Sequence, residues 1–211
     1  MVRISRQLQI QRCPHCSVAT PMMYNVWASE NAKGTDRADD QPPKAWALYL
    51  CATCGGGVVV EGTTAFHDSL VANVFPAPRI AHEDVPSVAR TFLQQAFDVL
   101  HAPDAAAVMA GSAVDAMLKA KGYHEGSLYS RIDKAREDGL LTQGMAEWAH
   151  SVRLGSNRPR HADVDRPHVN PDEAKQSVEF AEALGSFLFV LTARIERGIA
   201  AAETAEAAAT T

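Results

Sequence analysis

The chain carries two matched cysteine pairs, Cys13-Pro14-His15-Cys16 and Cys51-Ala52-Thr53-Cys54, which account for all four of its cysteines. The two-residue gap in each pair lets both sulfurs of one tight turn reach a single metal ion. Tetrahedral zinc takes four such thiolates, and two turns supply a complete, closed set. The glycines at 55–57 suit a chain that turns tightly beside a metal. We therefore predict one structural zinc ion bound by Cys13, Cys16, Cys51 and Cys54.

Paired cysteines have two other common uses. Structural disulfides belong to oxidising compartments, and the first seven residues lack the apolar core of an export signal. A redox dithiol does not need a matching second pair. We therefore expect a cytoplasmic protein. Its four-thiolate zinc has no open position for a substrate, so the metal supports folding and is not a reactive centre.

Residues up to about 62 have the composition of strands and loops. Runs rich in apolar, β-branched and aromatic residues occur at 26–27, 46–50 and 58–60, and another strand-like run lies at 7–11. A polar loop with glycine and proline separates the first two of these runs. The pattern predicts a zinc ribbon over residues 1–62. A linker over residues 63–84 follows, stiffened by Phe75-Pro76-Ala77-Pro78.

From about residue 84 the apolar residues follow the spacing of amphipathic helices. We expect five helices, beginning near residues 84, 103, 127, 142 and 170. The clearest start is Asn170, an N-cap residue followed by Pro171 and by Glu173 at the capping-box position. The second helix is rich in alanine, which is typical of the central helix of a bundle. The predicted fold is α+β: a zinc ribbon, an all-α bundle over residues 85–198 and a flexible tail over 199–211.

The formal net charge is −5 at pH 7, so the whole molecule is not an electrostatic binder of nucleic acid. The arginines nevertheless form two clusters: Arg3, Arg6 and Arg12, and Arg153, Arg158, Arg160 and Arg166. Local basic patches on an acidic protein can bind RNA or DNA, and the alternative is solvated surface arginines. No apolar run approaches the roughly 20 residues that cross a bilayer, so we expect no membrane contact.

The most polar segment of the second half is a predicted loop over residues 153–168. Arginine, asparagine, histidine and aspartate are concentrated there, and hydrophobic residues are nearly absent. A helix on each side would hold the loop at both ends, as is usual for binding residues. The candidates for chemistry are Arg153, Asn157, Arg160 and His161.

The helical half resembles a family of unknown function, DUF4145, which belongs to the broader HEPN group of helical-bundle proteins. The resemblance runs from about residue 86 to 189. It rests on AAAVMAGSAVDAMLK at 105–119, GSLYSRI at 126–132 and WAHSVR at 148–153, followed by Arg153, Asn157 and His161 in the order of the family's signature. Family members often carry an N-terminal zinc ribbon. The resemblance implies a HEPN-like bundle, often dimeric, from a group that includes RNA-cutting toxins and defence proteins.

The leading hypothesis from this resemblance is a nucleic-acid-interacting protein, acting as a metal-independent ribonuclease in prokaryotic defence or stress. A neutral His161 would take the proton from an RNA 2′-hydroxyl, and the resulting oxyanion would attack the adjacent phosphate. Arg153 or Arg160 would bind that phosphate through its guanidinium, and Asn157 would orient the ribose or hold the loop. Active HEPN members have four to six residues between arginine and histidine, whereas seven lie between Arg153 and His161.

The same residues have structural alternatives. Arg153 would pair with a carboxylate on a neighbouring helix, such as Asp115. Asn157 would cap a turn, and His161 would bond to the start of the fifth helix. A further alternative is a metal site formed by His161, Asp163, Asp165 and His168, whose oxygen and imidazole groups are suitable ligands.

The rival function is a non-catalytic adaptor whose ribbon and bundle bind a protein partner. We expect Trp27 and Trp46 to fill the core of the ribbon; if they are exposed beside the early arginines, they favour nucleic acid. An exposed apolar patch together with a buried 153–161 loop favours the adaptor. Long alanine-rich amphipathic helices leave apolar surface to cover, so we also expect a homodimer.

Overall fold

The structure is a computed structural model that describes residues 2–29, 38–41, 43–63, 69–162 and 164–209. The chain divides into two compact units, residues 1–79 and residues 80–211. The first contains strands and the second helices, so the α+β prediction is confirmed at this level. Within the described residues, no helix combines the length and apolarity needed to cross a membrane.

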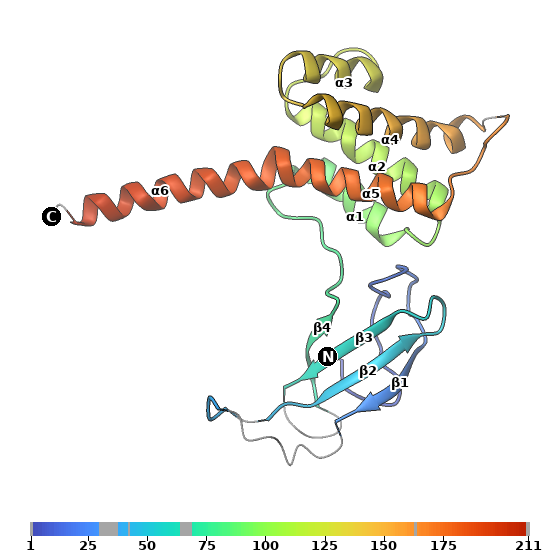
Figure 1. The fold of residues 1–211 in the computed structure, drawn as a ribbon, viewed down its shortest axis with the longest axis vertical. Coiled ribbons are helices and arrows are strands. Elements are labelled where there is room, and N and C mark those ends of the chain that lie inside the picture. Colours follow the sequence, from blue (N-terminus) through green and yellow to red (C-terminus); the bar gives the residue numbers. More distant parts are fainter. Residues whose placement is uncertain (1, 30–37, 42, 64–68, 163, 210–211) are drawn as a thin grey trace. The chain divides into compact units, whose positions relative to one another are not determined.

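The N-terminal unit is a four-stranded antiparallel sheet in the order β1-β2-β3-β4 (Figure 1). Its strands are β1 (Met23–Ala28), β2 (Trp46–Cys51), β3 (Gly57–Gly62) and β4 (Val71–Phe75). The first three match the predicted strand runs. β4 lies inside the predicted linker over 63–84, where Val71 and residues 73–75 pair with β3. The run at 7–11 is not a strand; Gln7 makes only an isolated bridge to Tyr24.

One face of this sheet packs against the N-terminal segment. Alternating residues of the strands point to that face, and Tyr49 and Val58 are fully buried there. Ile4 and Leu8 cover them from the N-terminal segment. The Tyr49 hydroxyl donates to the carbonyl oxygen of Ser5 at 2.6 Å. Burial raises the pKa of Tyr49, which remains a neutral hydrogen-bond donor.

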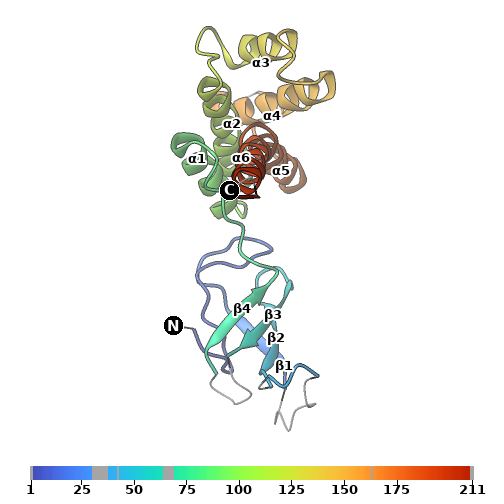
Figure 2. The ribbon, with the colours of Figure 1, turned by 90° about the vertical axis from the view of Figure 1, so that its left-hand side faces the viewer.

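The C-terminal unit is a helical bundle (Figures 1 and 2). Its elements are α1 (Ser87–Asp98), α2 (Pro103–Ala120), α3 (Leu128–Glu137), α4 (Gln143–His161), α5 (Pro171–Gly185), η1 (Ser186–Leu191) and α6 (Thr192–Ala209). As predicted, α2 is central, because it packs against α1, α4 and α5. Half of the buried residues of α2 are alanines. Alanine also makes up nearly half of the buried hydrophobic residues in the core of this unit. Small side chains let helix axes approach closely.

Three of the predicted helix starts coincide with side-chain caps, at Ser127, Thr142 and Asn170. Asn170 and Glu173 form the expected capping box of α5. After α5 the chain continues through the π-helical turn η1 into α6. The tail predicted to be flexible from residue 199 is helical to Ala209, since its alanines and glutamates are strong helix formers.

Candidate functional site

The four cysteines come together at one end of the sheet. Their sulfur atoms all lie within 4.8 Å of one another, and none is in a disulfide. The Cys13 and Cys54 sulfurs are 3.9 Å apart, close to the edge of about 3.8 Å expected for a tetrahedron with Zn–S bonds of about 2.3 Å. Four thiolates at this spacing fit a closed metal site with no position for a substrate.

Two turns with the same hydrogen bonds present the cysteines. In the first, Ser17 donates its N–H to the Cys13 carbonyl at 2.9 Å; in the second, Gly55 donates to the Cys51 carbonyl at 2.8 Å. Both donors have positive φ, 60° and 71° respectively. Glycine at position 55 signalled this conformation in the sequence, whereas serine at position 17 did not.

The surroundings of the sulfurs affect their proton affinity. Burial raises the pKa of Cys13, and it raises that of Cys16 to about 12. Burial also opposes ionisation of Cys51, but hydrogen bonds from the backbone N–H groups of Cys54 and Thr53 lower its pKa to about 7. Metal binding therefore has to displace protons from this cluster, which makes metal affinity depend on pH.

His15 is not part of the sulfur cluster. Its Nε2 lies 2.8 Å from the carbonyl oxygen of Gly57, so the imidazole links the first cysteine turn to the start of β3. A Cβ at Gly56 would lie only 2.5 Å from the His15 ring, so the glycine makes room for this contact. The link orients the two turns relative to each other.

The outer face of the sheet carries exposed aromatic side chains. Trp27 pairs with Leu48 across β1 and β2, and Leu48 pairs in turn with Val59 of β3. Directly opposite residues share a face, and the same alternation places two further aromatic residues of β1 and β2 there. Phe75 of β4 pairs with Val59 and lies 6.3 Å from the Trp46 ring. We call Tyr24, Trp27, Trp46 and Phe75 the aromatic face; they are 50, 55, 38 and 47% exposed.

The aromatic face corrects one expectation. Trp27 and Trp46 do not fill the core of the ribbon, because the strand register assigns them to the solvent side. The carboxylate of Glu61 lies on the same side, 6% exposed, and is paired with Lys44 and with Asn73. Its negative charge is therefore neutralised locally.

The predicted loop over 153–168 is also corrected. Residues 153–161 form the final turns of α4, which ends at Ala162 in a left-handed conformation. Arg153, Asn157 and His161 are spaced i, i+4, i+8 and so lie along one side of the helix. Arg153 is nevertheless about 12 Å from His161 along the axis, at 1.5 Å per residue. Arg160 is one residue from His161, and both side chains are exposed.

Arg153 belongs to a different cluster, between α3 and α4. Its guanidinium lies over the Tyr129 ring, 5.2 Å from the centroid, and the His150 ring lies 4.7 Å from the same ring. His150 Nε2 is 3.3 Å from an oxygen of Asp133. The proposed partner Asp115 instead accepts from Arg131 at 2.5 Å and from Lys119 at 2.7 Å.

This cluster was missed as a unit, although His150 and Arg153 lie within one stretch of the family resemblance at 148–153. Their i, i+3 spacing was the available signal. Among the described residues, His150 Nδ1 and Arg153 Nε are buried without a hydrogen-bond partner. Because the second ring nitrogen of His150 is buried, the geometry favours a packing role for this histidine.

The alternative metal site does not form among the described residues. The described part of the chain contains one group of suitable ligands, the four cysteines. His168 Nδ1 lies 2.7 Å from Asp104, whose other oxygen accepts from the backbone N–H of Val169 at 2.7 Å. Asp163 lies outside the described residues.

Comparison with known proteins identifies the helical part. The family model described as "Domain of unknown function (DUF4145)" matches residues 93–200. The chain belongs to the DUF4145 family. The match extends from the middle of α1 into α6, so it includes the end of α4 and excludes the cysteine turns and the aromatic face. No curated protein and no solved structure matches the chain.

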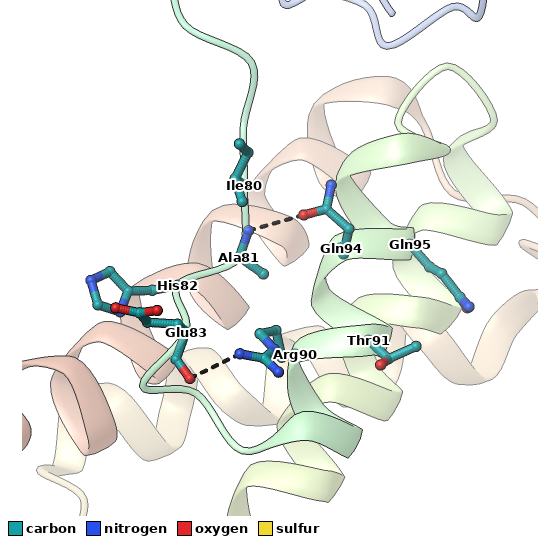
Figure 3. A pocket seen from close by; sticks show the side chains of 8 residues that line it. All are labelled: Ile80, Ala81, His82, Glu83, Arg90, Thr91, Gln94 and Gln95. Carbon is teal, nitrogen blue, oxygen red and sulfur yellow. Dashed lines mark hydrogen bonds between the residues drawn. The ribbon is translucent and has the colours of Figure 1, made fainter. Parts of the chain in front are cut away.

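Two hollows on the helical unit of this DUF4145 member are relevant to function. The first lies where residues 80–83 run beside α1 (Figure 3). Arg90 Nη1 donates to the Glu83 carbonyl at 3.0 Å, and the N–H of Ala81 donates to Gln94 Oε1 at 3.0 Å. Its polar groups therefore hold the segment that leads into α1, which is a structural role. The second hollow, beside α2 and Arg160, is lined by both apolar and basic side chains.

Proposed function

We propose that this protein binds single-stranded RNA, with the aromatic face stacking on unpaired bases. The observation that carries the proposal is the placement of four half-exposed aromatic rings on one side of a sheet. Every base has a π-face, and stacking on an aromatic side chain contributes about 1–3 kcal/mol per base without sequence preference. Arg6 lies beside β1, where its carbonyl accepts from the N–H of Asn25, and offers an exposed cation for phosphate at this edge.

The same proposal assigns the cysteine cluster a structural zinc ion. Cys13, Cys16, Cys51 and Cys54 would hold it, and the bound metal would supply cross-links that a small sheet cannot obtain from its core. The metal is thereby separate from the RNA contact. It rigidifies the end of β2 and the start of β3, and these strands carry part of the aromatic face.

RNA binding is tested by fluorescence anisotropy with a labelled single-stranded 12-mer and the same sequence as a duplex. We expect tighter binding of the single strand, and a roughly 10-fold loss for Trp27→Ser and for Trp46→Ser. Ile80→Ser is the matched control, since Ile80 is 77% exposed but lies on the helical unit. Few phosphates are contacted, so the salt dependence should be shallow. Equal affinity of both tryptophan variants and the wild type would contradict the proposal.

Cleavage is proposed for the end of α4. His161 is the base, Arg160 binds the phosphate and Asn157 positions the ribose; Arg153 is too far along the helix and is stacked on Tyr129. The HEPN resemblance supports this assignment and the connection with prokaryotic defence or stress. Attack of the 2′-oxygen breaks the bond from phosphorus to the 5′-oxygen of the next nucleotide, which leaves as a 5′-hydroxyl after it takes up a proton. Labelled RNA in excess chelator should therefore yield 2′,3′-cyclic phosphate and 5′-hydroxyl ends, at a rate at least 100-fold lower for His161→Ala. His101→Ala is the control, and the folding of all samples is verified first. Intact RNA with folded wild-type protein would exclude the activity.

The alternative function is an adaptor for a protein partner. The specific observation in its favour is that Leu50, which pairs with Tyr24 on the same side of the sheet, is an apolar residue that is 38% exposed. An adaptor would bind neither oligonucleotide and would keep its zinc and its fold. The anisotropy experiment therefore separates the two functions.

The proposed homodimer involves η1 and α6. Four large apolar residues, spaced four apart, are about half exposed along this continuous helix: Phe187, Leu191, Ile195 and Ile199. A second copy of the same stripe would cover them. Analytical ultracentrifugation should show a dimer that dissociates in Ile195→Lys, whereas a monomeric wild-type protein would exclude this pairing.

A further inference from the structure

The second hollow of the helical unit is a cavity of about 740 Å³. It is bounded by the first turns of α1, the middle and end of α2, the start of α3 and the last turn of α4. This volume is within the range of small-molecule binding sites, which combine apolar walls with a few convergent polar groups. All of its lining residues belong to the helical unit.

One wall of the cavity is apolar. Val88, Phe92 and Leu128 contribute to it from two helices, and Val88 is 63% exposed although it is a large aliphatic side chain. An apolar ligand surface placed here would be removed from water at about 25 cal/mol per Å². The wall therefore suits a flat or aliphatic body.

The lining also has a basic part, formed by charged side chains of α2, α3 and α4. Asp115 accepts from both Arg131 and Lys119, so two cations share one carboxylate. Arg131 also donates to the carbonyl oxygens of Gly126 at 2.6 Å and His124 at 3.3 Å, which holds its guanidinium in place. The Lys119 side chain is 44% exposed and keeps donors available for a ligand.

Arg160 is the third basic residue of the lining, after Lys119 and Arg131. It lines the cavity from the last turn of α4, and it has no ion-pair or hydrogen-bond partner within the described ranges of the chain. Its neighbour Arg158, by contrast, is bound to Glu173 at 3.2 Å. With Asp115 included, Lys119, Arg131 and Arg160 leave two positive charges in this part of the lining. The first turn of α1, which also lines the cavity, has no side-chain cap and no acidic residue, so its N–H groups add to the positive potential.

We propose that this cavity binds a small organic phosphate. Its apolar body lies against Phe92 and Leu128, and its doubly charged phosphate contacts Arg160 and Lys119. Guanidinium and phosphate match through paired, charge-assisted hydrogen bonds, and a dianion balances the two excess positive charges. The site is distinct from the aromatic face, because its lining residues all belong to the helical unit. It shares Arg160 with the proposed cleavage site at the end of α4 and goes beyond that function by taking a small molecule.

The test is isothermal titration calorimetry of the full chain with phenyl phosphate, and with inorganic phosphate and phenol as its two halves. We expect phenyl phosphate to bind at least 10-fold more tightly than either half. Arg160→Gln should weaken it at least 10-fold. Arg194→Gln is the matched control, because it removes the same charge from an exposed position on α6 and should leave the affinity unchanged.

A second variant tests the apolar wall without disturbing the fold. Val88→Asp places a carboxylate in the cavity, where it should abolish binding by repulsion, and acidic residues are favourable in the first turn of a helix. Equal binding of inorganic phosphate and phenyl phosphate would overturn the proposal, as would wild-type affinity in folded Arg160→Gln. Displacement of phenyl phosphate by equimolar single-stranded RNA would reassign the cavity to an RNA phosphate.

Discussion

The two units stabilise themselves in different ways. The N-terminal sheet has a small core in which Cys13 and Cys51 lie beside Tyr49 and Val58, whereas the helical bundle has a large core rich in alanine. A small unit buries a low fraction of its surface on folding and needs a further cross-link. A bundle with small side chains obtains its stability from close helix packing, and it is sensitive to added volume.

The two units also differ in the binding roles that we propose for them. The sheet can keep four aromatic side chains exposed on one face, because the N-terminal segment packs against the other face. The bundle buries the apolar faces of α2 and α5 in its core, and its proposed sites combine polar groups at the end of α4 and in the cavity beside α2. The proposed RNA contact and the proposed phosphate site therefore depend on different kinds of stability.

The strongest test of this comparison is loss of the proposed zinc ion. Cys54→Ser should unfold the N-terminal sheet and leave the helices intact, because apparent zinc-binding energies of small metal domains are about 10–16 kcal/mol. Cys54 is exposed, so its replacement removes little burial. Amide NMR spectra and the zinc content per chain measure the effect, with Thr53→Ala as the neighbouring control. A folded sheet without metal would break the comparison.

Added volume should affect the bundle. A Cβ at Gly111 of α2 would lie 2.6 Å from the Ser156 hydroxyl of α4, so Gly111→Ala should cost about 1–3 kcal/mol of unfolding free energy. Gly144, also helical, has open space around it, and Gly144→Ala should stabilise the bundle by up to about 1 kcal/mol. Chemical denaturation followed by Trp148 fluorescence compares them. If both substitutions changed the free energy of unfolding in the same direction, packing against Ser156 would not be the cause.

The two faces of the sheet should differ in a smaller way. Tyr49→Phe removes the hydroxyl that donates to Ser5 and accepts from its N–H at 3.2 Å, and should cost about 1 kcal/mol. Trp46→Phe on the aromatic face should change stability by less than about 0.5 kcal/mol. Urea unfolding of the zinc-loaded protein measures both. An equal loss of unfolding free energy in both variants would mean that the aromatic face is covered.

The smallest effect concerns acid stability of the bundle. The backbone N–H of Asn170 lowers the pKa of Glu173 most, and Arg158 and Arg166 lower it further. A depressed carboxyl pKa stabilises the fold above the ordinary value near 4.5 and loses this contribution as pH falls below it. Glu173→Gln should therefore cost about 1 kcal/mol or less at pH 7, since the side chain is 30% exposed. It should also flatten the loss of stability between about pH 5 and pH 3. If Trp148 fluorescence showed the same loss of stability at low pH in the variant and the wild type, this prediction would be contradicted.

Local chemistry made several features predictable. The cysteine spacing indicated which side chains gather, and Asn170 with Glu173 indicated the start of α5, because ligand turns and caps involve residues only a few positions apart. The central position of α2 followed from its alanines. The family resemblance located the end of α4 as a region of interest, although not its conformation.

The predictions from sequence were wrong where contacts between residues distant in the chain determine the local structure. Residues 153–161 contain Gly155, Asn157 and Pro159, which favour a loop, yet Gly155 and Ser156 are buried. Ser156 packs against Gly111 of α2, and this tertiary contact overrides local propensity. Arg160 could not be placed in a cavity from sequence, because the cavity is built from four separate segments.

The sequence by itself determined which cysteines gather, the order of strands before helices and the helix starts, since each depends on short-range spacing. Only the tertiary structure decided which residues face outward. The run Trp46-Ala47-Leu48-Tyr49-Leu50 is apolar on both sides of a strand, so its alternation does not identify the buried face. Pairing with β1 and β3, and coverage by Ile4 and Leu8, bury Ala47 and Tyr49 and leave Trp46 exposed.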